Sequence, residues 1–141
     1  MGVAVREAGQ GDRETVGRLL AEYLFEFDGR TEPYPYFDAY WVEPQRVPLL
    51  IEADGGVAGF CLIRMRGDGW SIAEFSVIPR QRRAGVGRAA VDAVAERAAA
   101  AGAPYLEAKV HPDNPAALPF WLAVGFRVVE TPGVFITRRY L

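Results

Sequence analysis

The sequence predicts a single α/β domain of the α+β type, with a mixed and mostly antiparallel sheet of about seven strands and helices on both faces. The chain has 141 residues and half of them are hydrophobic, which suits one domain with a packed core. Short apolar runs separated by glycine turns come first, and helical patterns then alternate with strands. No linker-like segment divides residues 1–141.

The first half of the chain predicts one helix and four strands. Asp12 is expected to cap a helix that continues to about Phe27, because apolar residues recur there at helical spacing. Residues 30–46 hold three prolines and predict a loop with one short helix near 36–42. The strands are expected at 3–7, 47–53, 57–65 and 70–78, with turns at 54–56 and 67–69.

In the second half, a helix is predicted over residues 85–101 and ends at Gly102. Because this helix joins the strand at 70–78 to a strand at 104–110, the two strands should be parallel neighbours. The remaining elements are expected to be a helix at 114–124 and strands at 126–131 and 134–140.

Residues 75–88 predict a phosphate-binding loop between a strand and a helix. An apolar run ends at Pro79, a basic segment follows, and Gly85-Val86-Gly87 opens an alanine-rich helix. The first amides of a helix have no partner within it and favour anions, and arginines add forked donors. The same residues also fit a dinucleotide fingerprint, G-x-G-x-x-A. That interpretation is weaker, because five residues separate Pro79 from Gly85 and only one βαβ unit is present.

Two motifs together resemble the GNAT superfamily of N-acetyltransferases. Arg82-Arg83-Ala84-Gly85-Val86-Gly87 matches its R-x-x-G-x-G acyl-CoA loop, and Asn114 to Phe126 resembles its N-x-x-A-x-x-F-Y-x-x-x-G-F segment. Trp121 stands where that segment usually has tyrosine. The resemblance covers about residues 3–140. It implies that the strands at 70–78 and 104–110 splay apart to admit a pantetheine arm, and that the co-substrate is acetyl-CoA.

The resemblance also implies which residues contact acetyl-CoA. The Val77 backbone N–H would stabilise the oxyanion of the thioester carbonyl, and the Asn114 side chain would help to place the pantetheine. Asn114 is also a candidate helix cap. The expected cofactor-binding residues are Phe75, Ser76, Val77, Arg82, Arg83, Ala84, Gly85, Val86, Gly87, Arg88, Asn114 and Phe120.

Two side chains are candidates for the general base that an alkylamine acceptor requires. Glu74 should lie on the strand face opposite Phe75 and Val77 and among apolar neighbours. It is alternatively a sheet-face charge paired with Arg64 or Arg66. His111 is the only histidine and has a suitable intrinsic pKa, although its proline-rich surroundings also suit an ordinary surface loop.

Residues 22–41 interleave carboxylates with aromatic rings, a pattern that suits an organic cation. These aromatic side chains are alternatively core residues. The expected acceptor is a small, cationic primary amine, and the candidate acceptor-binding residues are Glu26, Tyr34, Tyr40 and Trp41.

Composition narrows the function classes. The net charge of −2 argues against a nucleic-acid binder, and one cysteine with one histidine argues against a metal site. No membrane partner is expected, and the expected location is cytoplasmic, as a monomer or homodimer. The expected function is acetyl transfer to an amine by direct attack in a ternary complex. A non-catalytic acyl-CoA-binding module and a protein or peptide N-acetyltransferase are the alternatives.

Overall fold

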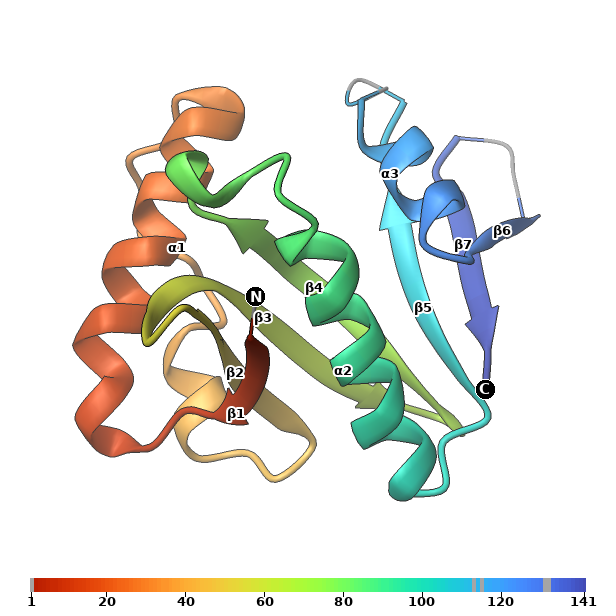
Figure 1. The fold of residues 1–141 in the computed structure, drawn as a ribbon, viewed down its shortest axis with the longest axis horizontal. Coiled ribbons are helices and arrows are strands. Elements are labelled where there is room, and N and C mark those ends of the chain that lie inside the picture. Colours follow the sequence, from red (N-terminus) through yellow and green to blue (C-terminus); the bar gives the residue numbers. More distant parts are fainter. Residues whose placement is uncertain (1, 113, 115, 131–132) are drawn as a thin grey trace.

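The computed structural model describes residues 2–112, 114, 116–130 and 133–141. Seven strands form one sheet in the order β1-β2-β3-β4-β5-β7-β6 (Figure 1). The pairing of β4 with β5 is parallel, and every other pairing given by the described residues is antiparallel. The predicted fold class, including the parallel neighbours joined through a helix, is therefore confirmed.

The strands lie close to their predicted positions. Continuous burial in the centre of β3, where Phe60 and Leu62 pack on one face and Cys61 and Ile63 on the other, places the apolar core on both faces of the sheet. Their bounds are β1 Val3–Glu7, β2 Arg46–Ala53, β3 Gly56–Arg66, β4 Gly69–Val77, β5 Tyr105–Val110, β6 Arg127–Glu130 and β7 Phe135–Tyr140.

Helices cover both faces of the sheet. The long helix α1 (Arg13–Asp28) packs on one face, together with the 3-10 turn at Asp38–Trp41. On the opposite face lie α2 (Val86–Ala100) and the short α3 (Ala117–Ala123), as Figure 1 shows. Within the described ranges, no helix has the length and apolar character needed to cross a membrane.

Two helix starts differ in part from the prediction. The helix α1 begins directly after Asp12, as predicted, but the Asp12 carboxylate accepts the Gly9 N–H at 2.9 Å and pairs with Arg6, so its side chain caps the preceding turn instead of α1. The third helix begins at Ala117, three residues later than predicted, and its N-terminal flanking residue is Ala116. Asn114 contributes its backbone carbonyl, which accepts the Ala117 N–H at 3.2 Å. Pro115, which the sequence predicts at the favourable first position of this helix, lies outside the described residues.

Candidate active site

The parallel strands β4 and β5 diverge after a short contact (Figure 1). Their pairing covers only Trp70–Ile72 of β4 within the part of the chain that the structure describes. Further along β4, the Ile78 N–H donates to the Ala58 carbonyl at 2.8 Å. Because antiparallel partners alternate in hydrogen bonding, the amides and carbonyls of Phe75 and Val77 point away from β3. These groups face the gap beside β5, where no described strand pairs with them.

The loop after β4 presents backbone amides at the start of α2. The Arg82 Nε donates to the Val77 carbonyl at 2.7 Å and holds the loop against the strand end. Arg83 and Gly85 both have positive φ angles, 64° and 82°, and α2 begins at the next residue, Val86. Left-handed residues next to a helix N-terminus form an anion-binding concavity of amide groups. The predicted phosphate loop therefore has suitable backbone geometry.

The three loop arginines differ in what their side chains contact. The Arg82 guanidinium forms two hydrogen bonds with the Glu26 carboxylate, at 2.7 and 2.8 Å, and so links the loop to α1. Arg88 donates to the Ala123 carbonyl at the end of α3, at 2.6 Å. Arg83 is exposed at the cavity edge. Val86 is buried against the core beside Val77, so its amide and not its side chain is available to a ligand.

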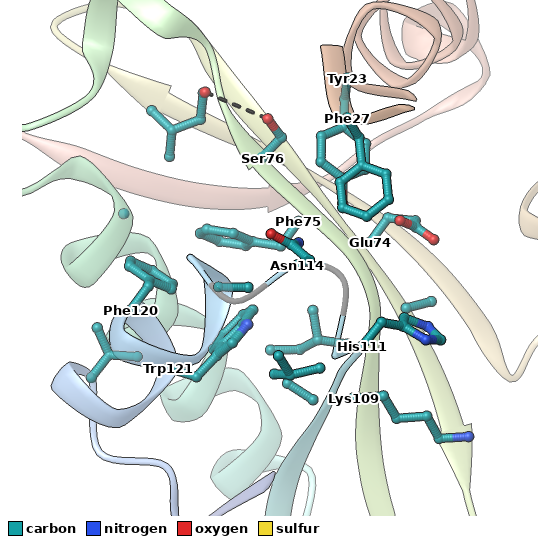
Figure 2. Close-up of a pocket in the computed structure, with 18 of the residues that line it drawn as sticks. Tyr23, Phe27, Glu74, Phe75, Ser76, Lys109, His111, Asn114, Phe120 and Trp121 are labelled. Carbon is teal, nitrogen blue, oxygen red and sulfur yellow. Dashed lines mark hydrogen bonds between the residues drawn. The ribbon is translucent and has the colours of Figure 1, made fainter. Parts of the chain in front are cut away.

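Aromatic side chains form one wall of the gap (Figure 2). The Phe75 ring stacks on Phe120 at 5.7 Å between centroids and meets Trp121 edge-on at 5.6 Å. Gly87 lies directly against this wall, because a Cβ added there would stand 3.1 Å from a Phe120 ring carbon. A larger residue at position 87 would therefore displace Phe120 or narrow the entrance to the gap.

Glu74 lies on the α1 side of the sheet because β4 contains a bulge. The register passes from the pair Ile63–Ile72 directly to the pair Leu62–Glu74, which leaves Ala73 as an extra residue. Ile72 packs into the core beneath α2, whereas Glu74 meets side chains from α1 and the loop after it. An uninterrupted strand, as predicted, would have put Glu74 on the same face as Ile72. Bulges commonly redirect a side chain at an active site.

The environment of Glu74 favours a proton acceptor that works near neutral pH. Burial raises the pKa of Glu74 to about 7, and the charge of Arg30 and the hydroxyls of Tyr34 and Tyr23 oppose part of that rise. Burial, with the nearby Glu74 charge, raises the pKa of both tyrosines well above the usual value, so they remain hydroxyl donors. In the described residues no ion pair joins Glu74 to Arg64 or Arg66, the alternative expected from the sequence.

One cavity of about 1020 Å³ connects the phosphate loop to Glu74 through the gap between β4 and β5. One end is lined by Tyr23, Tyr34 and Glu74, and the other by Arg82, Arg83, Gly85, Gly87 and Arg88. Asn114 and His111 line the middle from the β5 side, with the Asn114 amide near Phe75 and the His111 ring on the Glu74 side (Figure 2). The cavity is large enough for two substrates to meet in it.

The sequence of the chain matches the model of the acetyltransferase (GNAT) family over residues 14–126. The chain belongs to the GNAT acetyltransferase family. The same motifs that carried the resemblance, the loop before α2 and the segment around α3, both contribute residues that line the GNAT cavity described above. No curated protein sequence matches the chain significantly.

Solved GNAT structures share the fold over essentially the whole chain. The PaiA N-acetyltransferase of Thermoplasma acidophilum, in complex with coenzyme A, has 17% identity and a TM-score of 0.73, with 100% of both chains covered. An acetyltransferase of Thermus thermophilus has 22% identity and a TM-score of 0.78, with 100% and 98% covered. An Escherichia coli N-acetyltransferase acting on a ribosomal-protein alanine has 20% identity and a TM-score of 0.71, with 99% and 94% covered.

The structure separates the four GNAT acceptor residues expected from the sequence. Tyr34 lines the cavity beside Glu74, but Glu26 is engaged with Arg82 and does not line it. Tyr40 is 3% exposed and packs in the core beneath α1, and Trp41 packs at its edge. Neither side chain lines the large cavity. These two aromatic residues therefore pack in the core, which was the alternative expected from the sequence.

Several cavity residues were absent from the sequence-based site. Arg46, Ser71 and Lys109 line the end near Glu74, and Tyr36 joins them from the loop. They come from different strands, and only the register Arg46–Arg64–Ser71 brings the first two together. Alternation along each strand could have placed them on one face, but the pairing between strands was needed to make them neighbours.

Trp121 is expected to be a packing residue and not the general acid of this GNAT site. Its ring is 8% exposed and contacts Phe75, Phe120 and Phe126 edge-on at 5.0 to 5.6 Å. Indole can donate a hydrogen bond but does not titrate usefully. Trp121→Phe should therefore lower the rate of acetyl transfer by no more than about a hundredfold. Loss of a general acid or base can cost more, up to about 10⁴-fold. Initial rates with saturating acetyl-CoA would measure this.

A loss above about a thousandfold in folded Trp121→Phe would show that the indole has a direct chemical role. Trp121→Tyr provides the matched comparison, because it restores the residue usual in the family. Its rate should equal or exceed that of Trp121→Phe, with the difference growing at high pH.

The raised pKa of Glu74 also predicts a change in stability with pH. The ordinary value of 4.5 rises to about 7 in the folded chain, so folding favours the protonated carboxyl. Ionisation of Glu74 therefore lowers the free energy of unfolding. This loss is absent below pH 4.5 and complete above pH 7, where it reaches up to about 3 kcal/mol. Glu74→Gln should therefore be more stable than wild type at pH 8 and should lose this advantage by pH 4.5, as measured by urea unfolding.

Glu96→Gln is the matched control, because Glu96 is exposed on α2. Its stability difference from wild type should stay near zero across the same range. A Glu74→Gln difference that does not vary with pH would mean that Glu74 ionises at its ordinary value.

Proposed function

We propose that the chain transfers the acetyl group of acetyl-CoA to a primary amine by direct attack within a ternary complex. The observation that carries this proposal is the single cavity in which unpaired amides of β4 face a gap next to Glu74. One end of that cavity has the geometry for a phosphate chain, and the other holds a carboxyl with a pKa of about 7. The donor and the acceptor would approach from these two ends.

The described residues fit acetyl-CoA, which supplies the activated acetyl thioester. The amides of residues 83–88 suit the phosphates, and the amide and carbonyl of Phe75 with the Val77 N–H suit the amide groups of a pantetheine arm, as a sheet edge binds an extended chain. The Val77 N–H would then donate to the thioester oxygen. Because this amide is held in a strand, it is preorganised for the negative charge that develops there.

Glu74 supplies the remaining requirement, a base for the acceptor. Alkylamines are mostly protonated at neutral pH, and only the neutral amine has a lone pair for attack. Glu74 would take the proton, directly or through one water, while Tyr23 and Tyr34 orient its carboxylate. The amine nitrogen then bonds to the acetyl carbon and releases its second proton to solvent, the carbon–sulfur bond breaks, and CoA leaves as the thiolate, which takes up a proton from solvent.

The test of this proposal is turnover against a panel of primary amines. Release of the CoA thiol should rise on addition of an acceptor, and mass spectrometry should find one acetylated amine for each CoA released. Peptides with a free N-terminus belong in the panel as well. Tight CoA binding without acetylation of any amine between pH 6 and 9 would replace the proposal with a non-catalytic acyl-CoA-binding module.

A further inference from the structure

The acceptor end of the cavity is lined by positive charge. Glu74 is the sole acidic side chain among the described residues that line the cavity. The carboxylates of residues 22–41, which the sequence suggested for a cationic acceptor, do not line it. Basic side chains surround Glu74 on this side of the gap, and they are Arg30, Arg46, Arg64, Arg66 and Lys109.

Two of these arginines form a row across the sheet with a serine, and this set is called the arginine row. Arg46 of β2 pairs with Arg64 of β3, and Arg64 pairs with Ser71 of β4. Directly paired residues project from the same face, so two guanidinium groups and a hydroxyl lie side by side on the α1 side. Ser71 precedes Glu74 by three residues, about 10 Å along the strand. The row is therefore within reach of a small molecule whose amine sits at Glu74.

The Arg46 side chain is mostly buried, and two aromatic rings hold it in place. Its side chain is 9% exposed, and its guanidinium lies over the Tyr36 and Tyr40 rings at 4.8 and 5.4 Å. Among the described residues, its ion pair is a 3.3 Å contact from Nε to Glu43, which does not line the cavity. A cation so little exposed gains from a further counter-charge, and a fixed guanidinium binds carboxylate or phosphate with little loss of entropy.

The other cations differ in how far they are neutralised. Arg30 is paired with Asp28 at 2.9 Å. For Arg64, Arg66 and Lys109, the described residues provide no ion pair. The acceptor pocket thus carries an excess of positive charge next to the proposed base. A polyamine would bring further positive charge into that field, whereas an anionic group would find two or three donors.

We propose that the acceptor is a small molecule with a carboxylate or phosphate beside its primary amine, and that Arg64 and Arg46 bind this anionic group, with Lys109 across the gap. This assignment rests on the proposed acetyl transfer, because the amine must reach Glu74. Glu74 would then bind the amine of the acceptor, and the arginine row would bind its acidic group.

Matched pairs of amines test the assignment. Each pair has one member with a carboxylate or phosphate and one neutral isostere, the carboxamide or the hydroxyl compound. For wild type, kcat/KM should be higher with the anionic member than with its neutral isostere. Comparison of the carboxylate pairs with the phosphate pairs shows which anion the site binds. Arg64→Gln should reduce that preference about ten- to hundredfold, mainly through KM, because only the anionic acceptor loses a charge-assisted contact. Arg97→Gln, exposed on α2 and outside the cavity, should leave the preference intact.

A second measurement does not depend on turnover. In protein saturated with CoA, inorganic phosphate should bind at the arginine row and compete with the anionic acceptor, and Arg64→Gln should weaken this binding. Preference for the neutral isosteres, or equal losses for both members in Arg64→Gln, would overturn the assignment while leaving acetyl transfer standing. Acetylation of acidic peptides but of no small anionic amine would also overturn it. Phosphate binding at the row without acetylation of any amine would instead refute the proposed transfer.

Discussion

Glu74→Gln is expected to bind acetyl-CoA normally and to lose roughly 10²- to 10⁴-fold in turnover at neutral pH. Glutamine keeps the shape of the side chain and its contacts with Tyr23 and Tyr34 but cannot accept a proton. Because burial raises the pKa of Glu74 to about 7, wild-type turnover should rise as pH increases through that value. The carboxylate form then becomes the dominant form.

The deficit of Glu74→Gln should shrink as pH approaches the pKa of the amine itself, because the acceptor then arrives neutral. Rates of wild type, Glu74→Gln and the surface control Glu96→Gln across a pH series would resolve this. A deficit that is constant with pH would assign Glu74 to positioning the amine instead of deprotonating it. Unchanged turnover would make Glu74 structural and leave His111, which also lines the cavity, as the candidate base.

Gly87→Glu should abolish measurable CoA binding. The position lies in the first turn of α2, where the amides are suited to phosphate, and a carboxylate there would repel the ligand. A Cβ at this point would also stand 3.1 Å from the Phe120 ring, so a side chain would narrow the gap at the same time. Isothermal calorimetry with CoA would measure the loss, with circular dichroism to confirm that the variant folds.

Ala99→Glu is the matched control, since it adds the same charge to an exposed position near the other end of α2. It should bind CoA like wild type. Unchanged CoA affinity in folded Gly87→Glu would show that the phosphates bind elsewhere. Binding of NADH in place of CoA by wild type would favour the dinucleotide interpretation of the glycine motif.

The parts of the site that the sequence predicted are those encoded by local patterns. The phosphate loop depends on consecutive residues, with a strand, two glycines and a helix start, and the structure has them within one residue of the predicted helix boundary. The parallel neighbours β4 and β5 followed from the helix that connects them. The sequence singled out Glu74 because it is a carboxyl among apolar neighbours in a strand. In the structure this side chain is largely buried and contacts Tyr34.

The features that were missed depend on contacts between distant segments. The bulge at Ala73 arises from the pairing of β4 with β3, and no local residue pattern indicated it. The ion pair between Glu26 and Arg82 joins residues 56 positions apart and removes a carboxylate from the expected acceptor site. The row of Arg46 and Arg64 likewise depends on register. The sequence-based expectation of a cationic acceptor depended on the carboxylates of residues 22–41. The fold places these carboxylates outside the cavity, and their sequence alone did not indicate this.

In the proposed reaction, the acetyl group passes directly from acetyl-CoA in the β4–β5 gap to an amine beside Glu74. The most direct test combines initial rates, measured while both substrates are varied, with the intact mass of protein incubated with acetyl-CoA alone. Direct transfer predicts intersecting double-reciprocal plots and a protein mass without an added acetyl group. Parallel plots, together with an acetylated protein that passes its acetyl group to the amine, would contradict the account.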